Sequence, residues 1–510
     1  MRWHYRLNEA AAPAALLELL AALGHARRDG ARRLKRSLLD TFDGRLADAG
    51  LVLEAAQDKK GALELSLREA GDPRGDTWPA AQLPHLACDI ERPRLRARLE
   101  RITEQRALLV RGTASCERHR LVWHDAHAKR IATVDLEVYR IRRGQAALAL
   151  LTIRPVQGFE RACARLLGHL TRSKLVTALT EDPGDTLLAA LGAPAPCRAK
   201  PLVELDRGMP AAAALAALFE AYGEVMWANE PGIIDNLDTE FLHDYRVALR
   251  SIRSWHGDLR KVVAKSARAR GRTELAELNR ITGRLRDLDV LAEQLPVYLA
   301  EGGGTHATQA AALAALVGAA RDRARRAVVK HFRSHHYRAF RRRWQALATD
   351  LARGRQTGRR GDARLHAVVL EALRRRHARV VNFDWSRAQD EPAVLHELRK
   401  ECKKLRYLLE GFQRLFDATL CRRAIVELKK VQTAMGDTWD LHVHHALLRE
   451  LAAALPGDDA RARAVLPVVI GLETRLTALE HAHCELVTRA FDHFRLPATQ
   501  RIYRRLLEQP

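Results

Sequence analysis

Two segments of the sequence carry histidine, arginine and lysine in the same order and at the same spacing. LHDYRVALRSIR occupies residues 242–253 and LHELRKECKKLR occupies residues 395–406, so His243 recurs as His396 after 153 residues. Arginine presents a planar fork that binds two phosphate oxygens at once, lysine adds a point charge, and a nearby anion favours protonated histidine. These residue types predict a binding site for a phosphate-rich anion. The repeated basic positions are His243, Arg246, Arg250 and Arg253 in the first segment and His396, Arg399, Lys403 and Arg406 in the second.

Helical geometry places the four basic residues of each segment on one stripe. With about 100° per residue they fall within an arc of roughly 80°. A basic stripe beside the buried face of a helix can line a cleft between packed halves, whereas a stripe opposite the core is only solvated. A single stripe is better explained by arginines that cap or bridge helices, but repetition at a fixed offset reverses this and favours a binding site. The neighbouring arc is apolar, with Leu242, Tyr245, Leu249 and Ile252 in the first segment and Leu395, Leu398, Cys402 and Leu405 in the second.

A second pair of segments repeats at the same offset. TELAELNRITGRLRDLDV (273–290) aligns without a gap on VELKKVQTAMGDTWDLHV (426–443), and Gly283 and Asp287 recur as Gly436 and Asp440. We interpret the two aspartates as partners of arginines, because unpaired carboxylates would repel an anionic ligand. The repeats predict an internal duplication with two pseudo-symmetric halves.

These four segments resemble the conserved histidine α-helical domain, CHAD, over about residues 207–510. The resemblance implies a helical bundle whose basic central cavity binds inorganic polyphosphate through the eight repeated basic residues. It also implies a cytoplasmic protein that associates with polyphosphate granules. Two departures predict weaker binding: Ser251 stands where a further arginine is common, and His442 replaces the acidic residue seen at Asp289.

The pattern of the chain predicts an α+β protein with two domains. Residues 1–180 contain alternating stretches such as GALELSLRE (61–69) and RIATVDLEVYR (130–140), which predict an N-terminal antiparallel β-barrel. Proline and glycine gather in residues 181–206, which predict a linker. Residues 207–510 are helical almost without interruption and predict an all-α duplicated bundle, with repeats at about 207–350 and 363–510.

The N-terminal segment SLLDTFDGRLADAGLVLEAA (37–56) resembles the CYTH or triphosphate tunnel family over about residues 1–175. The resemblance implies inward basic residues that hold a triphosphate, with Arg6, Arg68 and Arg106 as possible contacts. It also implies paired acids that hold a divalent metal. The opening strand, however, has basic residues in place of Glu-x-Glu-x-Lys, and Glu54 stands where an arginine is expected.

Asp135 and Glu137 are the remaining paired carboxylates of this N-terminal region. Two acids without the first pair form an incomplete metal site, so we expect a noncatalytic barrel with no catalytic residue and no cofactor. The alternative is a metal-dependent tri- or polyphosphatase that uses these two acids.

The charge of the chain permits a different partner. The net charge of +24 and the Arg-rich stretches at 321–344 and 372–380 are also typical of nonspecific nucleic-acid binding. Aromatic residues make up only 5% of the chain, so such binding would be directed at the phosphate backbone and sensitive to salt.

Other patterns argue against further classes of protein. His442 and His445 share a helix face, but no third ligand at suitable spacing is evident, so metal binding there is not predicted. No phosphate-binding Gly-rich loop or catalytic triad order appears. The seven cysteines contain no CxxC pair, and there is no secretory pattern and no apolar run that could span a membrane. We therefore expect a cytoplasmic protein without membrane contact, and the sequence predicts no oligomeric state.

Overall fold

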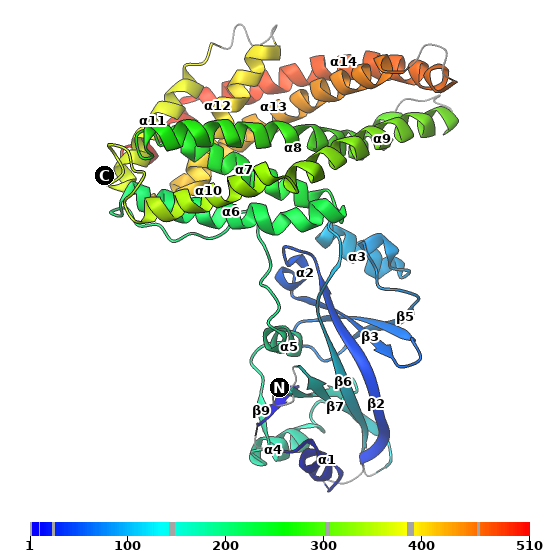
Figure 1. Ribbon diagram of the computed structural model, residues 1–510. Helices are drawn as coiled ribbons and strands as arrows, with labels where there is room; N and C mark the ends of the chain where they lie inside the picture. The colour runs from blue at the N-terminus through cyan, green and yellow to red at the C-terminus, as the bar shows by residue number, and fades with distance from the viewer. Residues whose placement is uncertain are drawn as a thin grey trace. The chain divides into compact units, whose positions relative to one another are not determined.

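The computed structural model describes residues 3–9, 11–22, 26–125, 127–141, 148–300, 307–384, 392–455 and 460–509 (Figure 1). The chain divides into two compact units, Met1–Arg198 and Ala199–Pro510. The first contains an antiparallel sheet and the second is helical, which confirms the predicted α+β class. Within the described residues, no helix is both long enough and apolar enough to cross a membrane.

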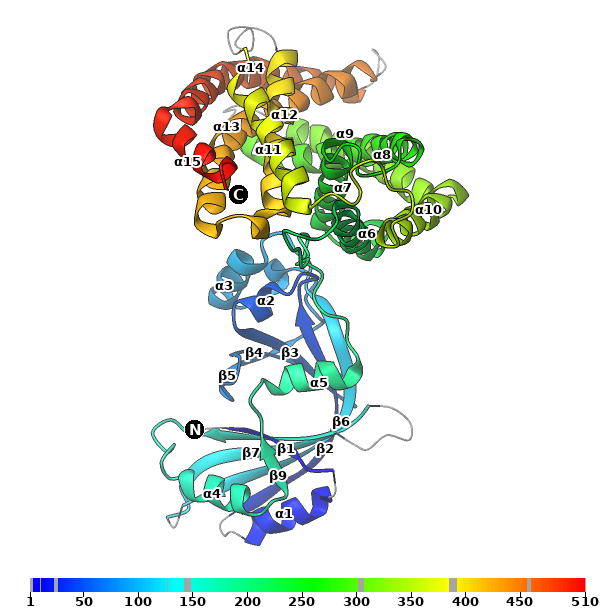
Figure 2. The same cartoon turned by 90° about the vertical axis from the view of Figure 1, so that its left-hand side faces the viewer.

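The N-terminal unit is built on one nine-stranded antiparallel sheet with the order β5-β4-β3-β2-β6-β7-β8-β1-β9. Figure 2 shows that the sheet is strongly curved. The edge strands β5 and β9 do not pair with each other within the described residues, so backbone hydrogen bonds do not close the sheet. The strands are β1 (His4–Leu7), β2 (Ala26–Asp40), β3 (Leu51–Asp58), β4 (Leu63–Glu69), β5 (Gly75–Ala80), β6 (Leu109–His124), β7 (Arg130–Arg140), β8 (Leu148–Pro155) and β9 (Val176–Ala178).

Alternation along the strands gives the sheet two different faces. The outer face is apolar and is covered at one end by α1 (Pro13–Ala22) and α4 (Ala164–Arg172), against which Tyr5 and Leu136 pack. The helices α2 (Arg45–Asp48) and α3 (Pro93–Thr103) and the short 3-10 turn Ala87–Asp89 cover its other end. The inner face carries the intervening residues, which include Asp135 and Glu137. Period-two patterning therefore places charged side chains together on the inner face.

The predicted linker at residues 181–206 begins later than expected, because Pro183–Leu191 form helix α5 on the N-terminal unit. Asp182 caps this helix through a hydrogen bond of 2.8 Å from the backbone N–H of Gly184. Leu187 packs with Leu34 and Leu150 in a buried apolar cluster. The helix forms although the segment is rich in proline and glycine, because it has its own N-cap and buries an apolar face.

The C-terminal unit consists of helices that repeat the duplicated sequence pattern. Helix α7 corresponds to α12. Helix α8 corresponds to α13, and α8 and α13 are each 36 residues long. The predicted apolar arcs of α7 and α12 are buried. The helices are α6 (Ala211–Asp235), α7 (Glu240–Asp258), α8 (Lys265–Ala300), α9 (Ala307–Phe332), α10 (His335–Ala352), α11 (Leu365–Val381), α12 (Pro392–Gly411), α13 (Ala418–Ala453), α14 (Ala460–Arg495) and α15 (Pro497–Leu507), with a 3-10 turn at Gln413–Leu415.

The two halves of the helical unit meet where α7 packs against α12. The Trp255 indole donates a 2.8 Å hydrogen bond to the carbonyl of Tyr407 and lies so close to Gly411 that a Cβ there would approach the ring to 2.5 Å. At the end of α7, the Asp258 carboxylate accepts a hydrogen bond of 2.7 Å from Nε of Arg376 on α11. Arg376 also pairs with Glu401 on α12. We call these contacts the α7–α12 seam, and they fix how the basic stripes face each other.

Candidate anion-binding site

A cavity of about 990 Å³ lies in the helical unit and is lined by α7, α8, α12 and α13. Both basic stripes point into it, because α7 and α12 contribute the repeated residues from the two halves. Seven of the eight predicted residues line the cavity, namely His243, Arg246, Arg250, Arg253, His396, Arg399 and Lys403. The structure therefore brings together residues that are 153 positions apart in the sequence.

Six further arginine and lysine residues line the same cavity and were not predicted. Helix α8 supplies four arginines and α12 supplies two lysines. The lining thus contains eleven arginine and lysine side chains but only two carboxylates, Asp287 and Asp440. The additional residues are Arg272, Arg280, Arg284, Arg286, Lys400 and Lys404.

A glycine on the second helix of each half lies beside the central arginine. Nη1 of Arg246 donates to the carbonyl of Asn279 (3.0 Å) and to Oγ1 of Thr282 (2.9 Å) on α8. A Cβ at Gly283 would lie 3.5 Å from that nitrogen, an ordinary van der Waals contact, so the guanidinium lies directly against the helix at this glycine. Gly436 holds the corresponding place beside Arg399, at 3.9 Å. The repeated glycine of each half therefore faces the repeated arginine.

The cationic side chains of the cavity lack enough negative charge around them. Burial, followed by the charges of Arg399 and Arg250, lowers the pKa of Lys403 to about 6. Burial and the charge of Arg250 lower the pKa of Arg246 to about 10. Burial also lowers the pKa of His396 to about 4, with the nearby lysines and arginines acting in the same direction. Each shift favours the uncharged form and would be reversed by an anion in the cavity.

Several donors in this region are buried without a partner. Within the described residues, Nε of Arg246, Arg250 and Arg399 and Nδ1 of His396 make no hydrogen bond. A buried polar group left unpaired costs about 1–3 kcal/mol, more if charged, so such groups are uncommon in folded proteins. Their concentration beside one cavity is expected of a site that receives its acceptors from a ligand.

The two aspartates of the lining behave as partners of arginine. Oδ1 of Asp440 lies 3.5 Å from Nη2 of Arg399. Burial raises the pKa of Asp287, while the charge of Arg246 opposes that shift. Acids outside the lining pair with Arg284, Arg286, Lys400 and Lys404. The two aspartates do not offset the other seven arginine and lysine side chains, so the potential of the cavity stays positive.

Arg406 is the predicted residue that does not line the cavity. Its Nε lies 3.9 Å from the Glu410 carboxylate, and its guanidinium lies 5.5 Å from the centre of the Tyr407 ring. The first half has Gly257 at the position of Glu410, so Arg253 has no such acid one turn later. The duplicated arginines therefore occupy different environments, and the prediction for Arg406 is corrected.

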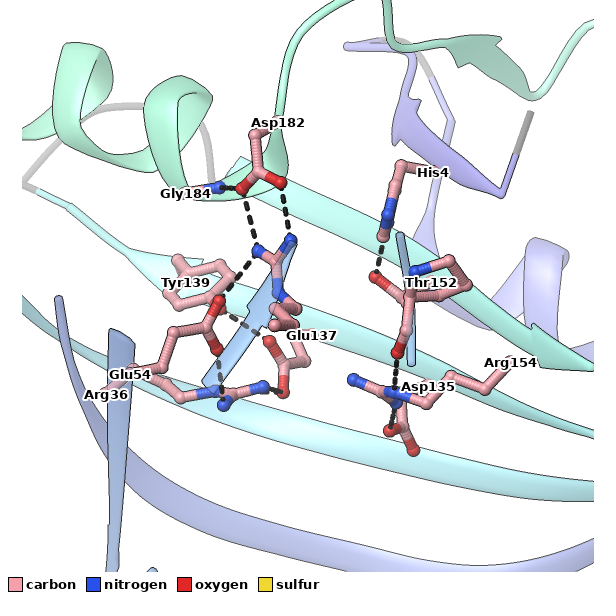
Figure 3. Close-up of polar contacts among 12 residues, drawn as sticks. His4, Arg36, Glu54, Asp135, Glu137, Tyr139, Thr152, Arg154, Asp182 and Gly184 are labelled. Atoms are coloured by element: carbon pink, nitrogen blue, oxygen red, sulfur yellow. Dashed lines mark hydrogen bonds and ion pairs between the residues drawn. The ribbon is translucent and has the colours of Figure 1, made fainter. Parts of the chain in front are cut away.

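The inner face of the N-terminal sheet carries a network of ion pairs. Figure 3 shows the side chains of Arg36, Glu54 and Glu137 pointing toward one another from β2, β3 and β7. Arg36 lies 3.0 Å from Glu54 and also pairs with Glu137, which accepts a 2.5 Å hydrogen bond from the Tyr139 hydroxyl. The space left between these side chains is about 30 Å³.

Glu54, Asp135 and the neighbouring Asp182 are also paired with arginine. Arg68 lies 2.8 Å from Glu54 and 2.7 Å from Asp182. Asp135 accepts hydrogen bonds of 2.7 and 2.9 Å from Arg120 and also pairs with Arg154. Burial alone would raise the pKa of Asp135, but these arginines lower it overall.

These residues do not fit the divalent metal that a triphosphate tunnel implies. The oxygens of Asp135 and Glu137 are directed at arginines, and a cation there would have to displace at least three guanidinium groups. Within the described residues, no cluster of three or more potential metal-binding side chains occurs. The pair His442 and His445 belongs to no such cluster, and the neighbouring His444 is hydrogen-bonded at 2.8 Å to the Tyr298 hydroxyl.

The three predicted phosphate contacts of this unit do not form one site. Arg68 lines the small inner space, but Glu54 and Asp182 engage its guanidinium. Arg6 is exposed, with Glu9 at 3.6 Å, and does not line that space. Arg106 is buried elsewhere, 3.5 Å from Asp43. The predicted set of Arg6, Arg68 and Arg106 is therefore corrected.

Comparisons with known proteins find matches to the helical unit. The family model for the CHAD domain matches residues 217–449. The CHAD domain from the plant Ricinus communis is 24% identical and covers 58% of this chain and 96% of its own, with a TM-score of 0.48. PptA from Streptomyces chartreusis is 18% identical, covers 56% of this chain and 98% of its own, and has a TM-score of 0.43.

The N-terminal part has its own structural neighbours. A putative adenylyl cyclase from Hippeastrum, described as having a dominant triphosphatase activity, is 15% identical and covers 38% of this chain and 96% of its own, with a TM-score of 0.28. No curated protein matches the chain. The match of the family model, together with two pseudo-symmetric halves around a basic cavity, shows that residues 217–449 of this chain form a CHAD domain.

Proposed function

We propose that the helical unit binds inorganic polyphosphate, or a similar linear polyanion, in the central cavity. The observation that supports this is the excess of arginine and lysine around one space of about 990 Å³, which eleven such side chains and two carboxylates line. Within the described residues, seven of the eleven make no ion pair with an acid outside the lining, whereas Arg284, Arg286, Lys400 and Lys404 do. A single phosphate would neutralise only a small part of that excess. A chain with one negative charge per internal phosphate supplies many charges in a small volume, together with the acceptors that the unpaired arginine donors lack.

Nucleic acid fits the cavity less well than polyphosphate. The aromatic side chains of the lining, other than histidine, are Trp439 and Tyr407, and the Trp439 ring already stacks on His396 with ring centres 3.9 Å apart. A nucleic-acid base therefore cannot stack on the face of Trp439 that His396 covers. Polyphosphate has no bases and needs no stacking partner.

A competition titration tests the function. Labelled long-chain polyphosphate is titrated at near-physiological salt in the presence of DNA at matched phosphate concentration. We expect binding that DNA does not displace, because the lining gathers its cations around one space. Equal competition by DNA would show that the diffuse charge of the protein, and not the cavity, is responsible. Association with polyphosphate granules in cells is a consequence of this proposal.

Binding should be coupled to the uptake of a proton by Lys403. Its pKa is about 6 in the empty cavity, and bound phosphates should return it toward the ordinary value of 10.5. Below pH 6 the lysine is already charged, so binding takes up no proton there. Between about pH 7.5 and 9 it charges on binding, and the Kd should rise by up to about tenfold per pH unit. Calorimetry in two buffers of different ionisation enthalpy measures the uptake.

Arginine at position 403 is the matched control, because it keeps its charge throughout this range. Lys403→Arg should still bind polyphosphate but should lose the proton uptake and the pH dependence above pH 7.5. His396, with a pKa of about 4, faces the same cavity and titrates at lower pH. Uptake that persists in Lys403→Arg above pH 7.5 would refute the assignment to Lys403.

We infer that the N-terminal unit is a noncatalytic scaffold, because arginines engage the acids of its inner face. The expected result is no phosphate release from triphosphate or polyphosphate with Mg²⁺ or Mn²⁺, and no change in melting temperature on adding a chelator. Asp135→Asn should lower the melting temperature of this unit, since it weakens the pairing of Arg120 and Arg154. Metal-dependent hydrolysis that Asp135→Asn abolishes would establish the enzyme instead.

A further inference from the structure

A second basic groove lies on α9 and at the start of α10. Its volume is about 560 Å³, and it is lined by Arg325, Arg326, Val329, Lys330, Arg333 and Ser334. None of these residues lines the central cavity. No carboxylate takes part in its lining, so the groove is positive and separate from the site described above.

Three of the cations form one exposed stripe. Arg326, Lys330 and Arg333 follow the i, i+4, i+7 spacing that places side chains on one face of a helix. Within the described residues, none of them lies within 4.0 Å of a carboxylate oxygen in an ion pair of the structure.

Three neighbouring arginines on the same two helices are paired with acids. Arg321 on α9 lies 2.6 Å from Asp289, and Arg341 on α10 lies 3.0 Å from Glu230. Arg343 lies 2.5 Å from Glu274. These acids lie where arginines join helices, whereas no acid lines the groove.

The end of α9 and the start of α10 both lie at the groove, so the partial charges of the two helix ends oppose each other and the cations set its potential. Ser334 is the N-cap, and its hydroxyl accepts a 3.1 Å hydrogen bond from the backbone N–H of Tyr337. Because Ser334 also lines the groove, the partial positive charge of the helix N-terminus lies at one end of it.

We propose that this groove is a second binding site for polyphosphate, so that one protein holds two stretches of the polymer. The identity of the ligand rests on the function proposed for the cavity. No aromatic side chain lines the groove, so nothing in its lining would stack with a base, and a bare phosphate chain fits it better than a nucleic acid. Fewer cations and an open surface make this site weaker and more sensitive to salt than the cavity.

Calorimetry with a short chain tests the proposal by stoichiometry. A linear polyphosphate of about ten phosphates is short enough for each molecule to occupy one site and long enough to meet most cations of the cavity. We expect two molecules per wild-type protein, a tight and a weak one. The variant Arg326→Gln/Lys330→Gln/Arg333→Gln should bind one molecule with the tight Kd unchanged.

A matched control separates a local site from diffuse charge. Arg501, Arg504 and Arg505 are exposed on α15, and the last two lie in its final turn, as Lys330 lies in the final turn of α9. Their triple glutamine variant removes the same charge and similar contacts with a helix C-terminus. It should still bind two molecules. Loss of the weak step in this control, or its retention in the groove variant, would overturn the proposal.

Long-chain polyphosphate gives a second, independent measurement. A protein with two sites cross-links long chains, so light scattering should rise near equivalence for wild type and for the α15 control but not for the groove variant. Failure of the cavity function has a different signature: the tight step is absent from wild type while the weak step remains sensitive to the groove variant. Scattering that the groove variant leaves unchanged would contradict two-site binding.

Discussion

Replacing Arg246, Arg250, Arg399 and Lys403 together with alanine should weaken the binding of long-chain polyphosphate by about 100-fold or more. Hydrogen bonds to charged groups contribute about 1.5–3 kcal/mol each, and this variant removes the four most central cations of the cavity. Fluorescence anisotropy with a labelled chain at near-physiological salt measures the change in Kd. The residual binding should depend on salt as expected of the exposed groove and surface.

The control for this variant removes the same charge elsewhere. Arg414→Ala/Arg501→Ala/Arg504→Ala/Arg505→Ala changes exposed residues that do not line the cavity. Its Kd should stay within a few-fold of wild type. The cavity variant should also melt no lower than wild type, because burial and mutual repulsion lower the pKa values of Lys403 and Arg246, so their charged forms destabilise the empty fold. An equal loss of affinity in both variants would refute the cavity as the site.

Asp258→Ala should destabilise the helical unit by about 3–5 kcal/mol, because it leaves the Arg376 guanidinium buried without its main partner. The two side chains are 1% and 6% exposed, and they join the end of α7 to α11. Glu401 on α12 still contacts Arg376 but cannot balance it alone, since it also pairs with Lys404. The helical signal in circular dichroism, followed against denaturant, measures the free energy of unfolding.

An exposed pair of the same kind provides the comparison. Glu450 accepts hydrogen bonds of 2.7 and 2.6 Å from Arg284, and the two side chains are 61% and 38% exposed. Glu450→Gln should cost less than about 1 kcal/mol, because solvent screens the pair. If Asp258→Ala is no more destabilised than Glu450→Gln, the seam does not hold the halves together as described.

The sequence predicts the core of the candidate site because the duplication repeats it. Residues shared by both halves are found by alignment at one offset, and helical spacing then assigns them to a stripe beside the core. Arg406 shows the limit of this reasoning. Whether a repeated arginine enters the cavity depends on the residue one turn later, which is Gly257 after Arg253 but Glu410 after Arg406.

The arginines of α8 were missed because the second half does not repeat them. Arg280, Arg284 and Arg286 correspond to Thr433, Asp437 and Trp439 at the same offset. A search for conserved pairs between halves passes over residues that only one half carries. The available signal was the periodic spacing of arginines on a helix that already carried Gly283 and Asp287.

The ion pairs of the N-terminal unit could not be predicted without the register of the sheet. Alternation along β7 correctly places Asp135 and Glu137 on one face, but it cannot show what lies opposite them. Asp135 pairs with Arg120 because the two residues are register partners of β6 and β7, and Arg36 reaches Glu137 from β2. Such partners come from residues distant in sequence, so a pair of acids alone looks like an incomplete metal site.

The two halves contribute different basic residues, and this difference bears on the directions in which a polymer chain can lie in the cavity. The first half contributes arginines of α8 to the cavity lining, and the second half contributes lysines of α12. A nucleic-acid strand has distinct 5′ and 3′ ends, so reversing it in such a site would change every contact. A polyphosphate chain is the same in both directions, so a pseudo-two-fold frame accepts it either way round. The two copies are then free to specialise separately, because only the total charge and its placement along the path must be kept.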